Sequence, residues 1–274
     1  MRVGPRRGES AGGLREWADG VPGPAVRGRV RAYTGYREES PTPADRWEAP
    51  AGELILIVGF GAESRAQPEA GVGEPQAYTS FFAGMNDRPT RIAHDGHQFG
   101  MQIRLDPLGA YALFGPPMHE LANRTVELSD LLGADAERWA GRLSEAPGWG
   151  ERFALLDRLL AARMAAGPVP SPEVAWAWRT MRRAGGAVRV ADLVTGAGCT
   201  HRHLLARFRD QVGTAPKTAA RVLRFERAAR LLARGEPAPA QVAAVCGYAD
   251  QSHLTRDFAR FAATTPAAVR RAAP

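Results

Sequence analysis

Apolar residues recur every four positions in segment 199–213, in the C-terminal third of the chain. This spacing predicts an α-helix with one narrow buried stripe, formed by Leu204, Phe208 and Val212. Thr200 is placed to cap this helix, because its hydroxyl accepts a hydrogen bond from a first-turn N–H group. Segment 190–198 has the pattern of a short helix that ends in a glycine turn. The two segments together predict a helix-turn-helix unit.

The same pattern occurs a second time along the chain. Segment 241–248 predicts a short helix with a glycine near its end, and segment 250–261 predicts a longer helix capped by the Asp250 carboxylate. Its buried stripe comprises Leu254, Phe258 and Phe261. Segment 216–233 predicts one continuous connecting helix, and a last short helix is predicted at 267–271. The C-terminal region is therefore expected to contain two helix-turn-helix units joined by a long helix.

The pattern before residue 107 is typical of strands. It predicts strands at 26–36, 53–60, 78–82 and 99–105, separated by Gly/Pro-rich loops at 61–77 and 84–90. Helices are predicted to follow at 107–114, 135–145 and 151–166. The predicted fold class is α+β, with an N-terminal β-rich, barrel-like domain and flanking helices, followed by an all-α domain.

The 274 residues are enough for two domains with separate cores. We expect residues 1–20 to be disordered, 21–166 to form the first domain, 167–172 to be a stiff proline-rich linker and 173–272 to form the second domain. Residues 1–20 lack the apolar core of a signal peptide, and no segment approaches the roughly 20 apolar residues of a membrane helix. We therefore expect a cytoplasmic protein with no membrane partner.

Charge is distributed unevenly between the two predicted domains. Residues 1–171 contain 19 Lys or Arg against 22 Asp or Glu, a net charge of −3, whereas residues 172–274 contain 17 against 7, a net charge of +10. A basic surface kept for solubility does not explain this segregation. One basic domain beside a slightly acidic one is typical of a protein in which only one half meets nucleic-acid phosphate.

The two helix-turn-helix units and their connecting helix resemble the DNA-binding domain of the AraC/XylS family of transcription regulators. The most specific match is the sequence Val-Ala-Ala-Val-Cys-Gly-Tyr-Ala-Asp-Gln-Ser-His-Leu-Thr-Arg-Asp-Phe at 242–258, and Thr265-Pro266 also matches. Three positions depart from the family pattern. His253 and Leu254 replace aromatic residues, and Ala263 replaces a glycine of the last turn.

The N-terminal half is similar to the domain that precedes such DNA-binding domains in a group of actinobacterial regulators. The resemblance is carried by the motifs at 104–115, 120–121 and 126–132. It implies a bacterial regulator whose N-terminal domain binds a small-molecule effector, dimerises, or both. The alternative is an interaction or homodimerisation module without a ligand. RNA polymerase is a further implied partner.

The resemblance also implies how double-stranded DNA is recognised, with each second helix in a major groove. The exposed stripes that would face bases comprise Arg202, Leu205, Ala206, Gln251, Ser252, Thr255 and Arg256. The residues expected to contact the DNA backbone are Thr200, Arg207, Arg209, Lys217, Arg221 and Arg260. One chain is expected to contact two successive major grooves, about 10 base pairs apart.

Aromatic and apolar residues of the predicted strands either line an effector pocket or form an ordinary core. The residues assigned to the pocket are Phe60, Tyr78, Phe82, Phe99, Met101 and Arg104. Arg91 and Arg104 would bind an acidic effector or lie as ordinary surface arginines. His94, His97 and His119 are interpreted as turn and surface histidines, since no further Cys/His cluster completes a metal site.

Neither catalysis nor a cofactor is expected. Some DNA-repair alkyltransferases combine an AraC-like domain with a zinc-bound acceptor cysteine, but residues 1–198 contain no cysteine. Cys199 and Cys246 lie one in each helix-turn-helix unit and are interpreted as structural thiols rather than disulfide partners. The sequence therefore predicts a regulator and not an enzyme.

Overall fold

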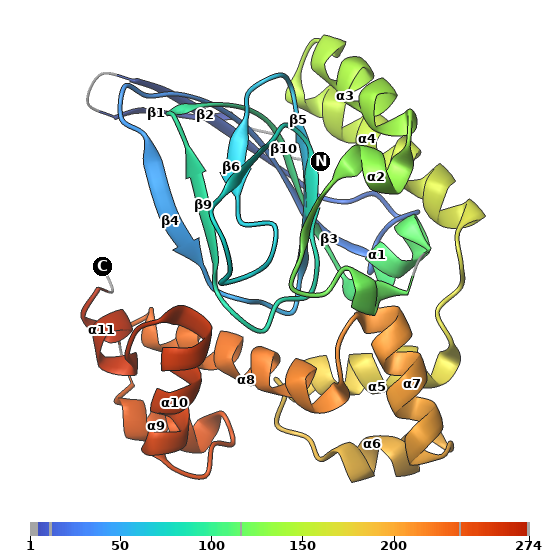
Figure 1. The fold of residues 1–274 in the computed structure, drawn as a ribbon, viewed down its shortest axis with the longest axis vertical. Helices are drawn as coiled ribbons and strands as arrows, with labels where there is room; N and C mark the ends of the chain where they lie inside the picture. The colour runs from blue at the N-terminus through green and yellow to red at the C-terminus, as the bar shows by residue number, and fades with distance from the viewer. Residues whose placement is uncertain (1–4, 11–12, 116, 236, 273–274) are drawn as a thin grey trace.

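The computed structural model describes residues 5–10, 13–115, 117–235 and 237–272. Two antiparallel β-sheets face each other in the N-terminal domain, and helices cover the outer face of the larger sheet (Figure 1). The C-terminal domain is entirely helical, and its connecting helix runs along one end of the sheets (Figure 1). The predicted α+β class is therefore confirmed. Within the described residues, no helix combines the length and the apolar character that crossing a membrane requires.

Every pairing between the named strands is antiparallel. The larger sheet has the order β1 (Pro5–Ser10), β2 (Gly13–Gly20), β3 (Val30–Glu39), β10 (His97–Leu105), β5 (Leu54–Gly59), β8 (Phe81–Ala83) and β11 (Thr125–Glu127). The smaller sheet has the order β4 (Ala44–Glu48), β9 (Thr90–His94), β6 (Ser64–Ala66) and β7 (Gln76–Tyr78).

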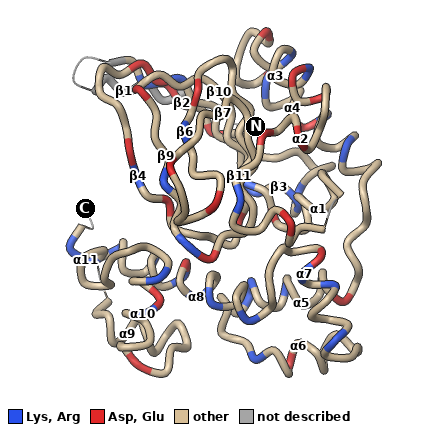
Figure 2. Tube along the Cα trace, viewed as in Figure 1, with Lys and Arg blue, Asp and Glu red and all other residues tan. Residues whose placement is uncertain are grey.

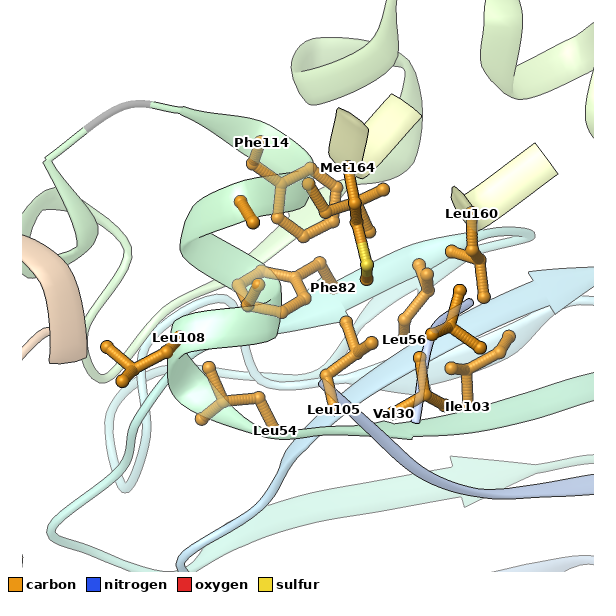
Figure 3. Packing of buried hydrophobic residues seen from close by; sticks show 14 of the residues in the cluster. Val30, Leu54, Leu56, Phe82, Ile103, Leu105, Leu108, Phe114, Leu160 and Met164 are labelled. Carbon is orange, nitrogen blue, oxygen red and sulfur yellow. The ribbon is translucent and has the colours of Figure 1, made fainter. Parts of the chain in front are cut away.

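Alternation along the larger sheet separates a helix-facing side from a side that faces the smaller sheet. Leu54, Leu56 and Val58 of β5 belong to the main core, whereas Ile57 packs with Phe81 on the opposite side. The main core is completed by the N-terminal domain's helices α1 (Pro107–Phe114), α2 (Leu128–Leu132), α3 (Asp135–Glu145) and α4 (Trp149–Ala166) and by the 3₁₀ helix η1 (Met118–Glu120). Figure 3 shows sheet residues such as Leu56 and Phe82 turned toward α1 and α4.

Residues 1–20 were expected to be disordered, and the structure corrects this expectation. Pro5–Ser10 and Gly13–Gly20 form a hairpin, while residues 1–4 and 11–12 lie outside the described residues. β2 pairs with β3 from Leu14 to Gly20, and Ala18 is buried. The backbone pairing stabilises the strand without the apolar alternation that sequence patterns require. Four other strands, β4, β6, β9 and β11, also lie outside the predicted ones, and β7 overlaps a predicted strand only at Tyr78.

The helical domain follows the predicted order closely. Its helices are α5 (Pro172–Arg183), α6 (Val190–Ala197), α7 (His201–Val212), α8 (Pro216–Leu232), α9 (Pro239–Val245), α10 (Gln251–Ala262) and α11 (Pro266–Arg271). α5, α6 and α7 share one continuous hydrophobic core with the N-terminal domain, whereas α9 and α10 pack on the second half of α8 in a separate core. The first helix-turn-helix unit is thus fused to the N-terminal domain.

A buried carboxylate strengthens this fusion. Asp106 caps α1 and accepts hydrogen bonds from the Trp178 indole at 3.0 Å and from Arg182 at 3.3 Å, both on α5. The segment before α5 is also held in place, because the backbone N–H of Ser171 donates to the buried Gln211 side chain of α7 at 2.9 Å. The predicted linker is therefore anchored at Ser171, whereas Val169 in its middle is 79% exposed.

Candidate nucleic-acid interface

The first helix-turn-helix unit is built from local sequence features. α6 ends at Gly198, which has a left-handed φ of +65° that a glycine adopts without strain. Thr200 then caps α7, and its hydroxyl accepts a hydrogen bond from the backbone N–H of His203 at 3.2 Å. The predicted stripe of Leu204, Phe208 and Val212 is fully buried. The predicted cap and the predicted buried face of α7 are both found.

The opposite face of α7 lies open to solvent. Arg202, Ala206 and Arg209 are exposed, and so is the neighbouring Arg207, whereas Leu205 is half-buried. The His203 side chain hydrogen-bonds Glu173 of α5 at 2.9 Å. This contact lowers the pKa of the Glu173 carboxyl. An arginine-bearing face is thereby left available for a partner.

The second unit repeats this geometry. Gly247 provides a left-handed turn with φ of +75° after α9, and the Asp250 carboxylate accepts the first-turn N–H of His253 at 2.6 Å. Gln251, Ser252 and Arg256 are exposed on α10. Thr255 is half-buried, and its hydroxyl donates to the backbone carbonyl of Gln251 at 2.9 Å. The exposed residues of α10 therefore form a second polar face of the same type.

Two of the residues expected to contact the DNA backbone have protein partners in this structure. Arg221 of α8 donates to the fully buried Asp257 of α10 at 2.6 Å and lies over the Phe261 ring. Arg260, at the end of α10, donates to Asp87 of the N-terminal domain at 2.5 Å. The expectation that Arg221 faces phosphate is corrected, since its guanidinium neutralises an internal carboxylate. Arg260 joins the two domains in this structure.

The connecting helix α8 places the two units on one side of the N-terminal domain (Figure 1). Lys217 is exposed in the first turn of α8. Arg202 and Arg209 are exposed on α7, and Arg256 is exposed on α10. Figure 2 shows more Lys and Arg than Asp and Glu along the helical domain, in accord with its net charge of +10 from 17 basic and 7 acidic residues. Such a surface attracts a polyanion.

A second candidate site lies between the two sheets. One cavity of about 280 Å³, here called the near cavity, is lined by both sheets and by Glu226 of α8. Another of about 360 Å³, the far cavity, lies toward β2 and β3. The walls that the two cavities share comprise Arg46, Ile57, Phe81, Ile92 and Gln102. The space between the sheets is therefore hollow over much of its length.

Only one of the six residues assigned to an effector pocket lines these two cavities. Arg104 lies on the wall of the near cavity. Phe82 and Met101 are fully buried in the main core on the other side of the sheet, and Phe60 and Phe99 pack edge to face against each other next to that core. Tyr78 is buried beside Phe81 and donates to the carbonyl of Thr125. The apolar residues assigned from the sequence thus serve mainly as core.

The three histidines lie apart in separate settings. His94 is buried, and its Nδ1 accepts the backbone N–H of Gly96 at 3.3 Å; burial lowers the pKa of its imidazole. His97 is beside Asp95, and His119 is beside Asp210 of α7. The part of the chain that the structure describes contains no group of three or more potential metal ligands. Cys199 and Cys246 are both free thiols.

Comparisons with known proteins agree with this geometry. Residues 193–272 match the family model of a helix-turn-helix domain. The HTH-type transcriptional regulator Rv1931c of Mycobacterium tuberculosis is 34% identical over 90 residues, which cover 33% of this chain and 35% of that protein. The match therefore spans about a third of the curated relative.

Two solved structures are also similar to part or most of this chain. The DNA-binding domain of AdpA, in complex with a target DNA, is 31% identical and aligns with 36% of this chain and 87% of that one, with a TM-score of 0.33. ToxT from Vibrio cholerae is 10% identical and aligns with 89% of this chain and 98% of that one, with a TM-score of 0.48.

Two capped second helices on one connecting helix define a double helix-turn-helix domain of the DNA-binding class. The class of this DNA-binding domain is narrowed by three observations: the family match at 193–272, the relative from M. tuberculosis and the motif at 242–258. Within residues 193–272, the chain is similar to the helix-turn-helix domains of transcription regulators of the AraC/XylS type.

Proposed function

We propose that this protein is a sequence-specific DNA-binding regulator of transcription, controlled by a small molecule that binds between the two sheets of its N-terminal domain. The observation that carries the first part is the pair of exposed faces on α7 and α10, each beginning at a side-chain cap. An α-helix fits the major groove of B-DNA, and arginine and glutamine contact base edges there. The hollow interior of the N-terminal domain supports the second part.

The residues proposed to contact bases are Arg202, Leu205, Ala206, Gln251, Ser252, Thr255 and Arg256. Thr200, Arg207, Arg209 and Lys217 are proposed to contact phosphate, as is Arg260 when it is released from Asp87. The proposal includes two further partners implied by the family resemblance, RNA polymerase and a second copy of the chain.

The test uses the full chain. Duplexes selected from a random library should converge on one sequence, and affinity for it should fall steeply with salt. Arg256→Ala should weaken binding to the selected duplex by roughly 1–3 kcal/mol. Arg158→Ala is the matched control, because Arg158 is exposed on α4 of the other domain. Failure to select any sequence would refute sequence-specific binding.

Control by a ligand is tested separately from DNA binding. A compound that binds the folded N-terminal domain should raise the free energy of unfolding, by about 2.7 kcal/mol at a hundred times its dissociation constant. The same compound should change the affinity of the full chain for the selected duplex. A domain that acts only in dimerisation or protein binding would show neither effect across a chemically broad library.

A further inference from the structure

The two helix-turn-helix units have the same residue spacing. Their second helices, α7 and α10, are each 12 residues long, and they begin at His201 and Gln251. Each position on α7 therefore corresponds to the position 50 residues later on α10. A residue with a left-handed backbone follows each helix, and the next helix begins with Pro216 in the first unit and Pro266 in the second. The correspondence therefore continues beyond the second helices.

Side chains at corresponding positions also have corresponding surroundings. The third residue of each helix is a histidine whose backbone N–H donates to the side-chain cap. His203 hydrogen-bonds Glu173 of α5 at 2.9 Å, and His253 lies edge to face on the Tyr248 ring, with ring centroids 5.1 Å apart. Both histidines are therefore in contact with protein side chains. The offset of 50 residues thus relates equivalent structural positions and not only helix lengths.

This correspondence shows that the first unit has one more position of the base-contacting type. The fourth position proposed on α10, Gln251, corresponds to His201 on α7. Both residues are the first of their helix, and both side chains are exposed. The other three proposed positions on α10 have counterparts already proposed on α7: Ser252, Thr255 and Arg256 correspond to Arg202, Leu205 and Ala206 in that order.

We infer that His201 is a base-contacting residue of the first unit, in the place that Gln251 has in the second. The N-terminal residues of a helix in the major groove reach base edges. A neutral imidazole donates one hydrogen bond, and the major-groove edge of guanine presents two acceptors and no donor. His201 therefore favours guanine, whereas the amide of Gln251 matches the donor and the acceptor of adenine. This inference rests on the proposed function and adds a specificity-determining residue to it.

The test is selection from a random duplex library by the full chain and by its variants. The unchanged protein should select guanine at one base pair contacted by the first unit. His201→Gln should change this preference to adenine by at least about fivefold, because both units then have glutamine at this position. His201→Ala should relax the preference without creating a new one. Gln251→His should produce the opposite change, from adenine to guanine, about 10 base pairs away.

His203→Gln is the matched control, because it replaces a histidine in the same turn of α7 that contacts Glu173. This control should leave the selected sequence unchanged. An equal loss of affinity for every duplex in both His201 variants, or no effect in either, overturns the inference and leaves sequence-specific binding intact. A change of base preference in His203→Gln as large as that in His201→Gln overturns it as well. If the unchanged protein selects no sequence, the proposed function fails and the inference fails with it.

Discussion

Arg260 of α10 donates to Asp87 of the N-terminal domain at 2.5 Å. The second helix-turn-helix unit has its own hydrophobic core, whereas the first shares its core with the N-terminal domain. The Arg260–Asp87 ion pair therefore anchors the unit that has the weaker attachment. A DNA phosphate near the end of α10 would compete with Asp87 for the same guanidinium.

Asp87→Asn should accordingly strengthen DNA binding by the full chain several-fold, because Arg260 becomes available to phosphate. The gain should disappear in the double variant Asp87→Asn with Arg260→Ala, measured as a double-mutant cycle. Asp45→Asn is the control, because Asp45 pairs with Arg91 on the N-terminal domain and its loss changes the net charge equally. A gain that persists without Arg260 would show that the pair does not compete with DNA.

A second ion pair joins α10 to α8. Asp257 is fully buried and paired with Arg221, whose own side chain is 31% exposed. Removing one partner of a buried pair leaves an uncompensated charge, which costs about 3–5 kcal/mol in fully buried cases. We expect Arg221→Ala to lower the free energy of unfolding by about 3 kcal/mol in urea. Arg138→Ala, which breaks an exposed pair with Asp135, should cost less than about 1 kcal/mol. Similar small effects for both variants would contradict this account.

The last turn of the domain contains a strained residue. Ala263 follows α10 with φ of +47° and ψ of +32°, a left-handed conformation that an L side chain adopts at a cost of about 1 kcal/mol or more. Ala263→Gly should therefore raise the free energy of unfolding by roughly 0.5–1 kcal/mol. Gly198→Ala, at a turn with φ of +65° and open space around it, should do the opposite. Thermal and urea unfolding of the two variants provide the comparison.

The helical domain could be predicted from the sequence because its signals are local. The stripes of α7 and α10, the caps Thr200 and Asp250, and the turn at Gly198 are all encoded within a few neighbouring residues. The same information is missing for Asp257, which lies between exposed Arg256 and buried Phe258. Only the packing of α10 on α8 shows that this carboxylate is buried beside Arg221.

The interior of the N-terminal domain was less predictable for a related reason. Residues 54–58 of β5 are all apolar, so alternation does not reveal which of them face the helices and which face the near cavity. Asp87 and Glu226 likewise have no local pattern that marks them as interdomain contacts. Their roles depend on how the second helix-turn-helix unit lies against the sheets.

His94 provides a pH-dependent prediction. Burial lowers the pKa of this imidazole, so the folded protein disfavours its protonation relative to the unfolded chain, whose histidines titrate near 6.5. Its contribution to stability is present above that pH and is lost as the pH falls. The drop in unfolding free energy between pH 7.5 and 5.5 should be smaller in His94→Gln than in the unchanged protein. His97→Gln, at an exposed position, should retain the full drop.

The last prediction separates base contacts from phosphate contacts. Arg202 and Arg256 are exposed in the first half of α7 and α10, where the first turns of a recognition helix reach base edges. Replacing either with Ala should cost roughly 1–3 kcal/mol on the selected duplex and relax the preference at one base pair. Arg209 lies later on α7, where the helix axis is expected to leave the groove.

Arg209→Ala should therefore weaken binding to all sequences about equally and reduce the salt slope by about one unit. The three variants are compared on the selected duplex and on its single-base variants, at several salt concentrations. An equal loss on every duplex for Arg202→Ala and Arg256→Ala would place both side chains on the DNA backbone. Gln251, which is exposed on α10, and the half-buried Thr255 would then be the main residues through which the second unit distinguishes bases.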